Sequence, residues 1–286
     1  MSKDRVVQEV EAALGSEVLG WRAVSGGDIN QAHRAELSDG RVVFVKSNAR
    51  APAGMFAAEA RGLAWLAEAR ALRVPAVLAQ GSDFLVLENI DEADRRADHD
   101  EQFGRGMAAL HGSGAPGFGL DHDNFIGRLE QSNGTLPSWA EFYRARRLEP
   151  QLRMAVDGGR ASPAMRRGLG RILPRLEELV GPPEPPARLH GDLWGGNAIV
   201  DDRGLPCLID PAVYGGHREV DLGMMKLFGG FGARVFAAYH EAFPLAPGHE
   251  SRVPLYQLYF LMVHVNLFGG SYLAQVEHAL ARIGSC

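Results

Sequence analysis

Alternation of apolar and polar side chains marks the first third of the chain. It predicts four short β-strands, at residues 31–36, 41–45, 76–80 and 84–87. The turn Ser38-Asp39-Gly40 joins the first two strands as a hairpin. Residues 55–70 carry apolar side chains at helical spacing, and residues 1–14 have the pattern of an amphipathic helix. We therefore expect a small antiparallel sheet with one helix packed against it.

Helical spacing of apolar residues replaces this alternation after a charged connector at residues 88–96. It predicts helices at residues 98–111, 139–157, 163–180, 220–228, 234–243 and 250–283. A stiff Pro-rich stretch at residues 182–186 interrupts them. We expect an α+β fold of two lobes. The N-terminal, sheet-containing lobe covers residues 1–90, and the larger, mainly helical C-terminal lobe covers residues 91–286.

Composition narrows the class of protein. With 286 residues and 46% apolar side chains, the chain can bury a substantial core. A formal net charge of −5 gives no basic surface for nucleic acid or an anionic membrane, and the apolar stretch at residues 255–268 is too short to span a bilayer. Cys207 and Cys286 are too few for a disulfide framework or a four-ligand zinc site. The N-terminal residues lack the pattern of a signal peptide, so we expect a cytoplasmic monomer that acts on a small ligand.

The residues with the clearest chemistry lie in the segment His190-Gly191-Asp192-Leu193-Trp194-Gly195-Gly196-Asn197 and the following Leu208-Ile209-Asp210-Pro211. Phosphoryl transfer needs a carboxylate that takes the proton of the acceptor hydroxyl and oxygen ligands that hold Mg²⁺ against the phosphates of ATP. Asp192 suits the first role. Asn197 and Asp210 suit the second, because Mg²⁺ prefers oxygen ligands and takes few of them from protein.

Two other interpretations of this segment are open. Each Asp or Asn can instead make the ordinary hydrogen bonds of a turn. Alternatively, His190, Asp192 and His217 can be ligands of a hydrolytic zinc ion, because imidazole and carboxylate both bind zinc. The zinc interpretation leaves Asn197 and Asp210 without a role.

A lysine and a glutamate in the first third are predicted to form an ion pair. Lys46 directly follows the apolar run at residues 42–45. In a strand, alternate side chains share a face, so Lys46 lies on the same face as Phe44. Glu59 falls on the apolar face of the helix at residues 55–70, where an unpaired carboxylate is costly to bury. Pairing them would aim the ammonium at the nucleotide phosphates, as in protein kinases. The alternative is that both are solvated surface charges.

Weaker signals surround this set. The segment Ser25-Gly26-Gly27-Asp28-Ile29-Asn30 can lay backbone N–H groups over phosphates or form an ordinary turn, and the connector Glu88-Asn89-Ile90 can present backbone groups to adenine. Trp194 can stack on a sugar or pack its loop down. We assign structural roles to Asp221, which caps a helix or braces the loop of Asp192, and to His190, which stabilises that loop.

Taken together, these segments closely resemble the fructosamine kinase (ketosamine-3-kinase) family, relatives of aminoglycoside and choline kinases within the protein-kinase-like fold. The resemblance covers nearly the whole chain. It rests on Val43-Phe44-Val45-Lys46, Asp123-Asn124-Phe125-Ile126-Gly127, the segment at residues 190–197, Ile209-Asp210-Pro211-Ala212 and Phe228-Gly229-Gly230-Phe231. The His-Gly-Asp motif belongs to a wider superfamily, whereas the other motifs are narrower signals.

The resemblance implies transfer of the γ-phosphate of ATP to the 3-hydroxyl of a ketoamine, the Amadori product of glycation, in protein deglycation. Under it, Asp192 accepts the proton, Asn197 and Asp210 bind Mg²⁺, Lys46 contacts phosphate, residues 88–90 contact adenine and Trp194 borders the substrate pocket. Some relatives carry a cysteine in the nucleotide loop that allows redox-controlled dimers. Here that loop has Gly26-Gly27-Asp28, so this control is expected to be absent.

Several functional alternatives remain at this stage. The ketoamine can be a ribulosamine, an erythrulosamine or a fructosamine, either free or bound to protein. The same loop serves other acceptors, so a kinase for an aminoglycoside or an amino alcohol is the second hypothesis. A non-catalytic nucleotide-binding module is the third, and the presence of Asp192, Asn197, Asp210 and Lys46 together argues against it.

Overall fold

The computed structural model describes residues 3–24 and 30–283. Its N-terminal lobe is built on a five-stranded antiparallel sheet with the strand order β1-β2-β3-β5-β4. The elements of this lobe are α1 Lys3–Leu14, β1 Val18–Val24, β2 Gln31–Leu37, β3 Val42–Ser47, α2 Met55–Glu68, β4 Val77–Gln80 and β5 Phe84–Glu88. The four predicted strands are confirmed, and β1 precedes them.

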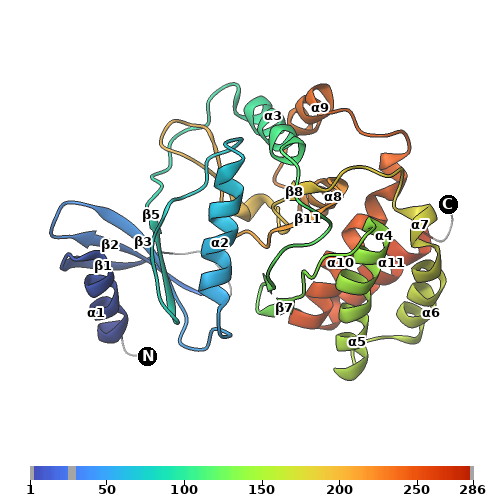
Figure 1. Ribbon diagram of the computed structural model, residues 1–286, viewed down its shortest axis with the longest axis horizontal. Helices are drawn as coiled ribbons and strands as arrows, with labels where there is room; N and C mark the ends of the chain where they lie inside the picture. The colour runs from blue at the N-terminus through green and yellow to red at the C-terminus, as the bar shows by residue number, and fades with distance from the viewer. Residues whose placement is uncertain (1–2, 25–29, 284–286) are drawn as a thin grey trace.

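Alternation along β3 decides which helix covers each face of the sheet. Val43 and Val45 pack with Val6 and Val10 of α1 in one apolar cluster. Phe44 points the other way and packs on the cluster that α2 forms with β5. Figure 1 shows the sheet between the two helices. The predicted packing of α2 is confirmed, and α1 covers the opposite face.

The C-terminal lobe is mainly helical. Its helices are α3 His99–Gly112, α4 Trp139–Phe142, η1 Tyr143–Leu148, α5 Glu149–Asp157, α6 Pro163–Ile172, η2 Leu173–Arg175, α7 Leu176–Leu179, η3 Gly195–Asn197, α8 Glu219–Phe228, α9 Ala233–Ala242, α10 His249–Phe268, η4 Gly270–Tyr272 and α11 Leu273–Ile283. Its short strands pair as β6 Asn124–Ile126 with β7 Leu129–Gln131, β8 Ala187–Leu189 with β11 Tyr214–Gly216, and β9 Ala198–Val200 with β10 Pro206–Leu208.

The structure corrects three of the predicted helices. The pattern at residues 250–283 is two helices, because Gly269, with φ 92, ends α10 before α11 begins. The pattern at residues 163–180 is interrupted by the 3₁₀ turn that contains Pro174, and the pattern at residues 139–157 contains the π-helix η1. Two of these interruptions carry a local sequence signal, the Gly269-Gly270 pair and Pro174, whereas the apolar spacing gives none for η1.

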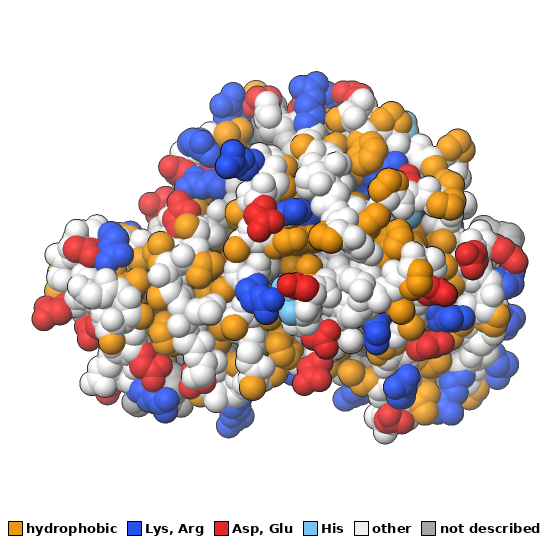
Figure 2. Space-filling model, viewed as in Figure 1, with side chains coloured by type: hydrophobic (Ala, Val, Ile, Leu, Met, Phe, Trp, Pro, Cys, Tyr) orange, Lys and Arg blue, Asp and Glu red, His pale blue; other side chains and the backbone are white. Residues whose placement is uncertain are grey.

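The core of the C-terminal lobe is arranged around α10. Most residues of this helix from Pro254 to Asn266 are buried, as expected for a helix enclosed by others. Within the described ranges, no helix is long and apolar enough to cross a membrane. On the face drawn in Figure 2, acidic and basic side chains are interspersed over both lobes. The lobe boundary at residue 90 stays a prediction, although β5 ends nearby at Glu88.

A glycine allows α3 and α9 to pack at close range. A Cβ atom at Gly104 of α3 would lie 2.2 Å from the carbonyl oxygen of Val235 and 2.9 Å from the amide nitrogen of Tyr239. Both neighbouring atoms belong to the backbone of α9, which cannot move aside without moving the helix. The contact therefore requires a residue without a side chain at position 104.

Gly104→Ala is expected to lower the free energy of unfolding by about 1–3 kcal/mol, because the added methyl group overpacks the helix interface. Chemical denaturation with urea measures the change. The matched control is Gly112→Ala in the same helix, where a Cβ atom would meet nothing within 4 Å. That control is expected to be neutral or stabilising by less than about 1 kcal/mol. Equal effects of the two substitutions would contradict this account of the packing.

Candidate active site

A buried carboxylate of α8 fixes the loop that carries Asp192. The two carboxylate oxygens of Asp221 accept hydrogen bonds from the amides of His190, at 2.8 Å, and Gly191, at 2.9 Å. The ring Nε2 of His111 lies 3.1 Å from the same carboxylate. Of the two roles expected for Asp221, bracing this loop is confirmed. The helix partner His111 was not foreseen from the sequence.

His190 links this loop to the strand segment that precedes Asp210. Its Nδ1 accepts a hydrogen bond from the amide of Asp192 at 3.2 Å, so the proton resides on Nε2, which donates to the carbonyl oxygen of Ile209 at 2.9 Å. Burial lowers the pKa of this imidazole, in keeping with the neutral form that both bonds require. The expected stabilising role of His190 is confirmed.

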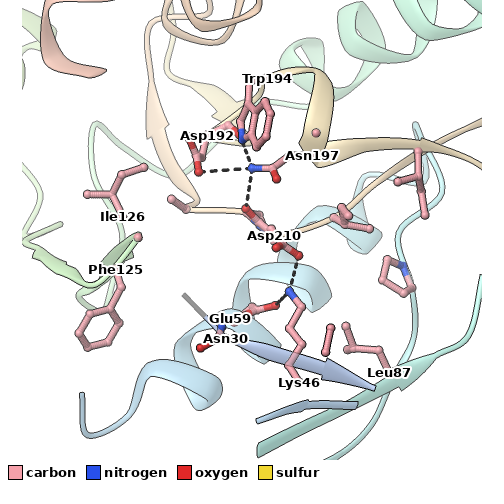
Figure 3. Close-up of a pocket in the computed structure, with 18 of the residues that line it drawn as sticks. Asn30, Lys46, Glu59, Leu87, Phe125, Ile126, Asp192, Trp194, Asn197 and Asp210 are labelled. Carbon is pink, nitrogen blue, oxygen red and sulfur yellow. Dashed lines mark hydrogen bonds and ion pairs between the residues drawn. The ribbon is translucent and has the colours of Figure 1, made fainter. Parts of the chain in front are cut away.

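Asn197 lies between the two aspartates. Its side-chain nitrogen Nδ2 donates to the backbone oxygen of Asp192 at 2.8 Å, and lies 3.3 Å from Oδ2 of Asp192 and 3.5 Å from the backbone oxygen of Asp210. These contacts orient the amide, as Figure 3 shows. None of the hydrogen bonds found among the described residues uses the amide oxygen Oδ1 of Asn197. That oxygen is therefore available to a cation.

The carboxyl group of Asp192 is partly buried beside this amide. Burial, and then the negative charge of Asp210, raises the pKa of Asp192 from its usual range to about 7. A carboxylate whose proton affinity is raised in this way is better suited to take a proton from a hydroxyl than a fully solvated one.

Lys46 connects the sheet lobe to the helical lobe. Its Nζ lies 2.5 Å from Oε1 of Glu59 on α2, and also contacts Oδ1 of Asp210. Burial alone would lower the pKa of Lys46, but the carboxylates of Asp210 and Glu59 raise it above its usual range. The predicted ion pair of Lys46 with Glu59 is confirmed. The contact brings the lysine to Asp210, one of the predicted metal ligands.

Asp210 adopts a left-handed backbone conformation, with φ 55. Such values are uncommon outside glycine, and Asp and Asn tolerate them better than most residues. The amide of Ile209 donates to the backbone oxygen of Asn197 at 3.0 Å. The two predicted metal ligands are thus held by adjacent backbone, at the ends of the β9–β10 hairpin.

These side chains line a cleft of about 1050 Å³ between the lobes. Apolar residues on one side belong to the sheet lobe and the β9–β10 hairpin, and include Phe44, Leu87 and Ile209. The helical lobe contributes aromatic residues from α8, α10 and η4 to another part of the wall. Lys46, Glu59, Asp192, Asn197 and Asp210 are among the polar residues of the lining. A nucleotide and a second ligand can therefore share one cleft.

An arginine that sequence reasoning missed anchors the connector between the lobes. The guanidinium of Arg73 donates to Glu88 at 2.7 Å and to Asp201 at 2.9 Å, and also contacts Asp202. Glu88, Asn89 and Ile90 line the cleft as expected, although the carboxylate of Glu88 is engaged by Arg73. Arg73 thus holds the connector against the turn of the β9–β10 hairpin. In the sequence it has no feature that separates it from a solvated arginine.

Buried amides attach the β6–β7 hairpin to the segment that follows Asp210. Asn124 donates to the carbonyl oxygen of Val213 at 2.8 Å, and Gln131 donates to that of Ala212 at 3.1 Å. The hairpin carries Phe125 and Ile126, which line the cleft (Figure 3). The Asp-Asn-Phe-Ile-Gly motif therefore belongs to the wall of the cleft.

The remaining predicted site residues differ in how far they can be placed. Gly26, Gly27 and Asp28 lie outside the described residues, and the flanking Val24 and Asn30 line the cleft. Trp194 also lines the cleft, with 42% of its surface exposed. Its ring lies over Gly196, where a Cβ atom would come within 2.3 Å of it.

The zinc interpretation is wrong for the part of the chain that the structure describes. No group of three or more His, Cys, Asp or Glu side chains there can hold a metal ion. His217 instead packs against Tyr256, with ring centroids 5.2 Å apart. Burial lowers its pKa to about 4, so its imidazole is neutral near pH 7. His190 and Asp192 remain together in the loop without it.

Two lobes around a cleft, with a strand lysine paired to a helix glutamate and an aspartate-bearing loop opposite, define a protein-kinase-like phosphotransferase. The chain belongs to the fructosamine kinase family, whose profile matches residues 2–285. Membership of a kinase family implies that ATP is the phosphoryl donor.

Individual relatives agree with this assignment. A predicted ketoamine kinase of Synechocystis is 41% identical over 96% of this chain and 94% of its own. The chloroplastic protein-ribulosamine 3-kinase of Arabidopsis thaliana is 38% identical over 87% of this chain and 78% of its own. The crystal structure of a predicted fructosamine-3-kinase from Thermobifida fusca has a TM-score of 0.92 and 40% identity, and each chain is covered over 100% of its length.

Asp221→Asn is expected to loosen the loop of Asp192. An amide offers one acceptor oxygen where the carboxylate offers two, so at least one buried donor of His190, Gly191 or His111 loses its partner. Each such loss costs about 1–3 kcal/mol of unfolding free energy. Denaturation measures that cost, and hydrogen exchange at the amides of residues 190 and 191 should accelerate. Asp157→Asn, at an exposed helix end, is the control. Unchanged exchange at both amides would contradict the bracing role.

Proposed function

We propose that this protein is an ATP- and Mg²⁺-dependent kinase that phosphorylates the 3-hydroxyl of ketoamines. The observation that carries the proposal is the convergence of Asp192, Asn197, Asp210 and Lys46 in one cleft. The class of acceptor comes from the relatives, which are named as ketoamine, ribulosamine and fructosamine kinases. Such an activity would serve the repair of glycated amines.

In this proposal Asp192 acts on the acceptor. Its carboxylate accepts the proton of the sugar hydroxyl while the hydroxyl oxygen bonds to the γ-phosphorus and the bond to ADP breaks. The backbone hydrogen bonds of Asp221 and His190 keep the carboxylate in place. Asn197 restrains Asp192 from the other side. The loop is thus held before any substrate binds.

Asn197 and Asp210 would hold Mg²⁺, which neutralises phosphate charge when it is bound. Their donor atoms fit, because both offer oxygens and Mg²⁺ prefers oxygen ligands. Lys46 would contact the phosphates, with Glu59 holding its ammonium in position. Residues 88–90 would receive the adenine. Contacts from Gly26, Gly27 and Asp28 to the phosphates remain part of the proposal.

Asp192→Asn is expected to lower kcat by roughly 10²- to 10⁴-fold, the usual contribution of a positioned base. Because the residue acts on the acceptor, ATP affinity measured by calorimetry should stay close to that of the wild type. Product formation is followed by mass spectrometry with ribulosamine, erythrulosamine and fructosamine adducts, both free and bound to protein.

The same measurement separates the alternatives. Wild-type turnover of an aminoglycoside or an amino alcohol, with none on any ketoamine, would move the proposal to that acceptor class. MgATP binding without turnover on any acceptor would favour a nucleotide-binding module. Full activity of Asp192→Asn would remove Asp192 from the role of base.

Asp210→Asn is expected to abolish most of the gain in ATP affinity that Mg²⁺ provides. The gain should fall by roughly tenfold or more. Removing a residue that merely orients a metal ligand already lowers metal affinity by about that factor. Calorimetric titration with ATP in Mg²⁺ and in EDTA measures the gain for each variant. Lys46 keeps its partner Glu59 in this variant, so binding in EDTA should change less. An unchanged Mg²⁺ gain would contradict the proposed ligand role.

A further inference from the structure

Four rings gather on the part of the cleft wall that the helical lobe contributes. His264 lies at their centre, with its ring centroid 4.7 Å from Phe228, 5.5 Å from Phe268 and 4.9 Å from Tyr272. Phe228 ends α8, Phe268 ends α10, and Tyr272 ends η4. All four line the cleft. We call Phe228, Phe268 and Tyr272 the aromatic wall.

This wall is unusually exposed for apolar side chains. Phe268 is 51% exposed and Phe228 is 37% exposed, and Trp194 in the same cleft is 42% exposed. Four of the six large apolar side chains that are exposed in the described ranges, these three and Val24, thus line this one cleft. Apolar groups gathered in a concave site mark a surface that a ligand covers.

Backbone contact ties the wall to the loop of Asp192. A Cβ atom at Gly230 would lie 2.7 Å from the Cα atom of Gly195, and one at Gly195 would lie 3.0 Å from the Cα atom of Gly230. Gly230 is two residues beyond Phe228, and Gly195 follows Trp194. The segments that carry Phe228 and Trp194 therefore touch, and both side chains line the cleft that contains Asp192.

The described side chains that α8, α10 and η4 contribute to the cleft are uncharged at neutral pH. The cleft residues from α8, α10 and η4 are Met224, Phe228, Phe260, Val263, His264, Leu267, Phe268 and Tyr272. The single basic group among them, His264, has its pKa lowered by burial, and its Nδ1 donates to the carbonyl oxygen of Phe260 at 2.8 Å. A guanidinium adjoins the wall at Leu267, where Arg128 donates to the carbonyl oxygen at 3.0 Å, but Arg128 does not line the cleft. The side chains of the wall therefore carry no charge of their own and offer mainly apolar contact.

We propose that the aromatic wall binds the N-substituent of the ketoamine and selects adducts of apolar or aromatic amines over adducts of small or acidic ones. The inference rests on the proposed function. A sugar whose 3-hydroxyl meets Asp192 has its amine nitrogen on carbon 1, two carbons away. Its substituent therefore begins a few bonds from the reacting hydroxyl, and the loop of Asp192 touches the segment of the wall at Gly195 and Gly230. Covering exposed rings with an apolar group removes apolar surface of both partners from water.

The test compares kcat/KM for ribulose adducts of glycine, phenylalanine and aspartate. The glycine and phenylalanine adducts differ only by a benzyl group. We expect the phenylalanine adduct to exceed the glycine adduct by roughly 10- to 100-fold, the range for burying an added apolar group in a pocket. The aspartate adduct should be no better than the glycine adduct. Phe268→Ala and Phe228→Ala should bring the phenylalanine-to-glycine ratio close to 1.

Two further variants sharpen this test. Leu78→Ala, at a side chain that is 40% exposed on β4 and does not line the cleft, should leave the ratio as in the wild type. Phe268→Arg should raise kcat/KM for the aspartate adduct relative to the phenylalanine adduct, because it adds a positive charge to the wall itself. Melting temperatures check that each variant is folded, and the exposure of Phe268 makes a large change unexpected.

The outcomes separate this inference from the proposed function. Turnover of all three adducts with equal kcat/KM would overturn the selectivity and leave the ketoamine kinase standing. A ratio that persists in both alanine variants would also overturn it. Absence of turnover on every adduct would overturn the proposed function, and this inference with it.

Discussion

The ammonium group of Lys46 holds the two lobes together at the polar part of the cleft. Its carboxylate partners come from different lobes, Glu59 from α2 and Asp210 from the end of the β9–β10 hairpin. A buried lysine is stable only with such partners, and removing one partner of a buried pair commonly costs about 3–5 kcal/mol. The relative position of sheet and helices is therefore coupled to the geometry of the same charges that a nucleotide would meet.

Most of the precision of the site comes from residues that brace the reacting groups. Asp221 and His190 fix the backbone around Asp192, and the buried amides of Asn124 and Gln131 fix the hairpin of the opposite wall. Arg73 fixes the connector. These contacts are made in the protein alone, so little rearrangement of the loop is needed when substrates bind. Preorganisation of this kind is a large part of how enzymes stabilise transition states.

The sequence predicted the parts of this arrangement that follow from local pattern. Period two in β3 and helical spacing in α2 were enough to pair Lys46 with Glu59, and the spacing from Asp192 to Asn197 and Asp210 singled out the segments that meet in the cleft. It could not predict contacts between distant segments. The three-residue strands β8 and β11 are too short to form a pattern. The partners of Asp221 and the rings of the aromatic wall depend on where helices meet. The partners of Arg73 depend on where the connector meets the β9–β10 turn, and no single stretch of sequence records either arrangement.

The left-handed backbone of Asp210 restricts which amino acids can occupy that position. Glycine would satisfy the conformation but has no side chain to meet Lys46. Glutamate would keep the negative charge, but it lacks the short polar side chain whose local hydrogen bonds let Asp and Asn adopt this conformation. Asparagine would fit the backbone and lose the charge. Among these residues, only aspartate both tolerates the backbone conformation and supplies the negative charge. Position 210 should therefore vary little among related sequences, even where the neighbouring hairpin varies.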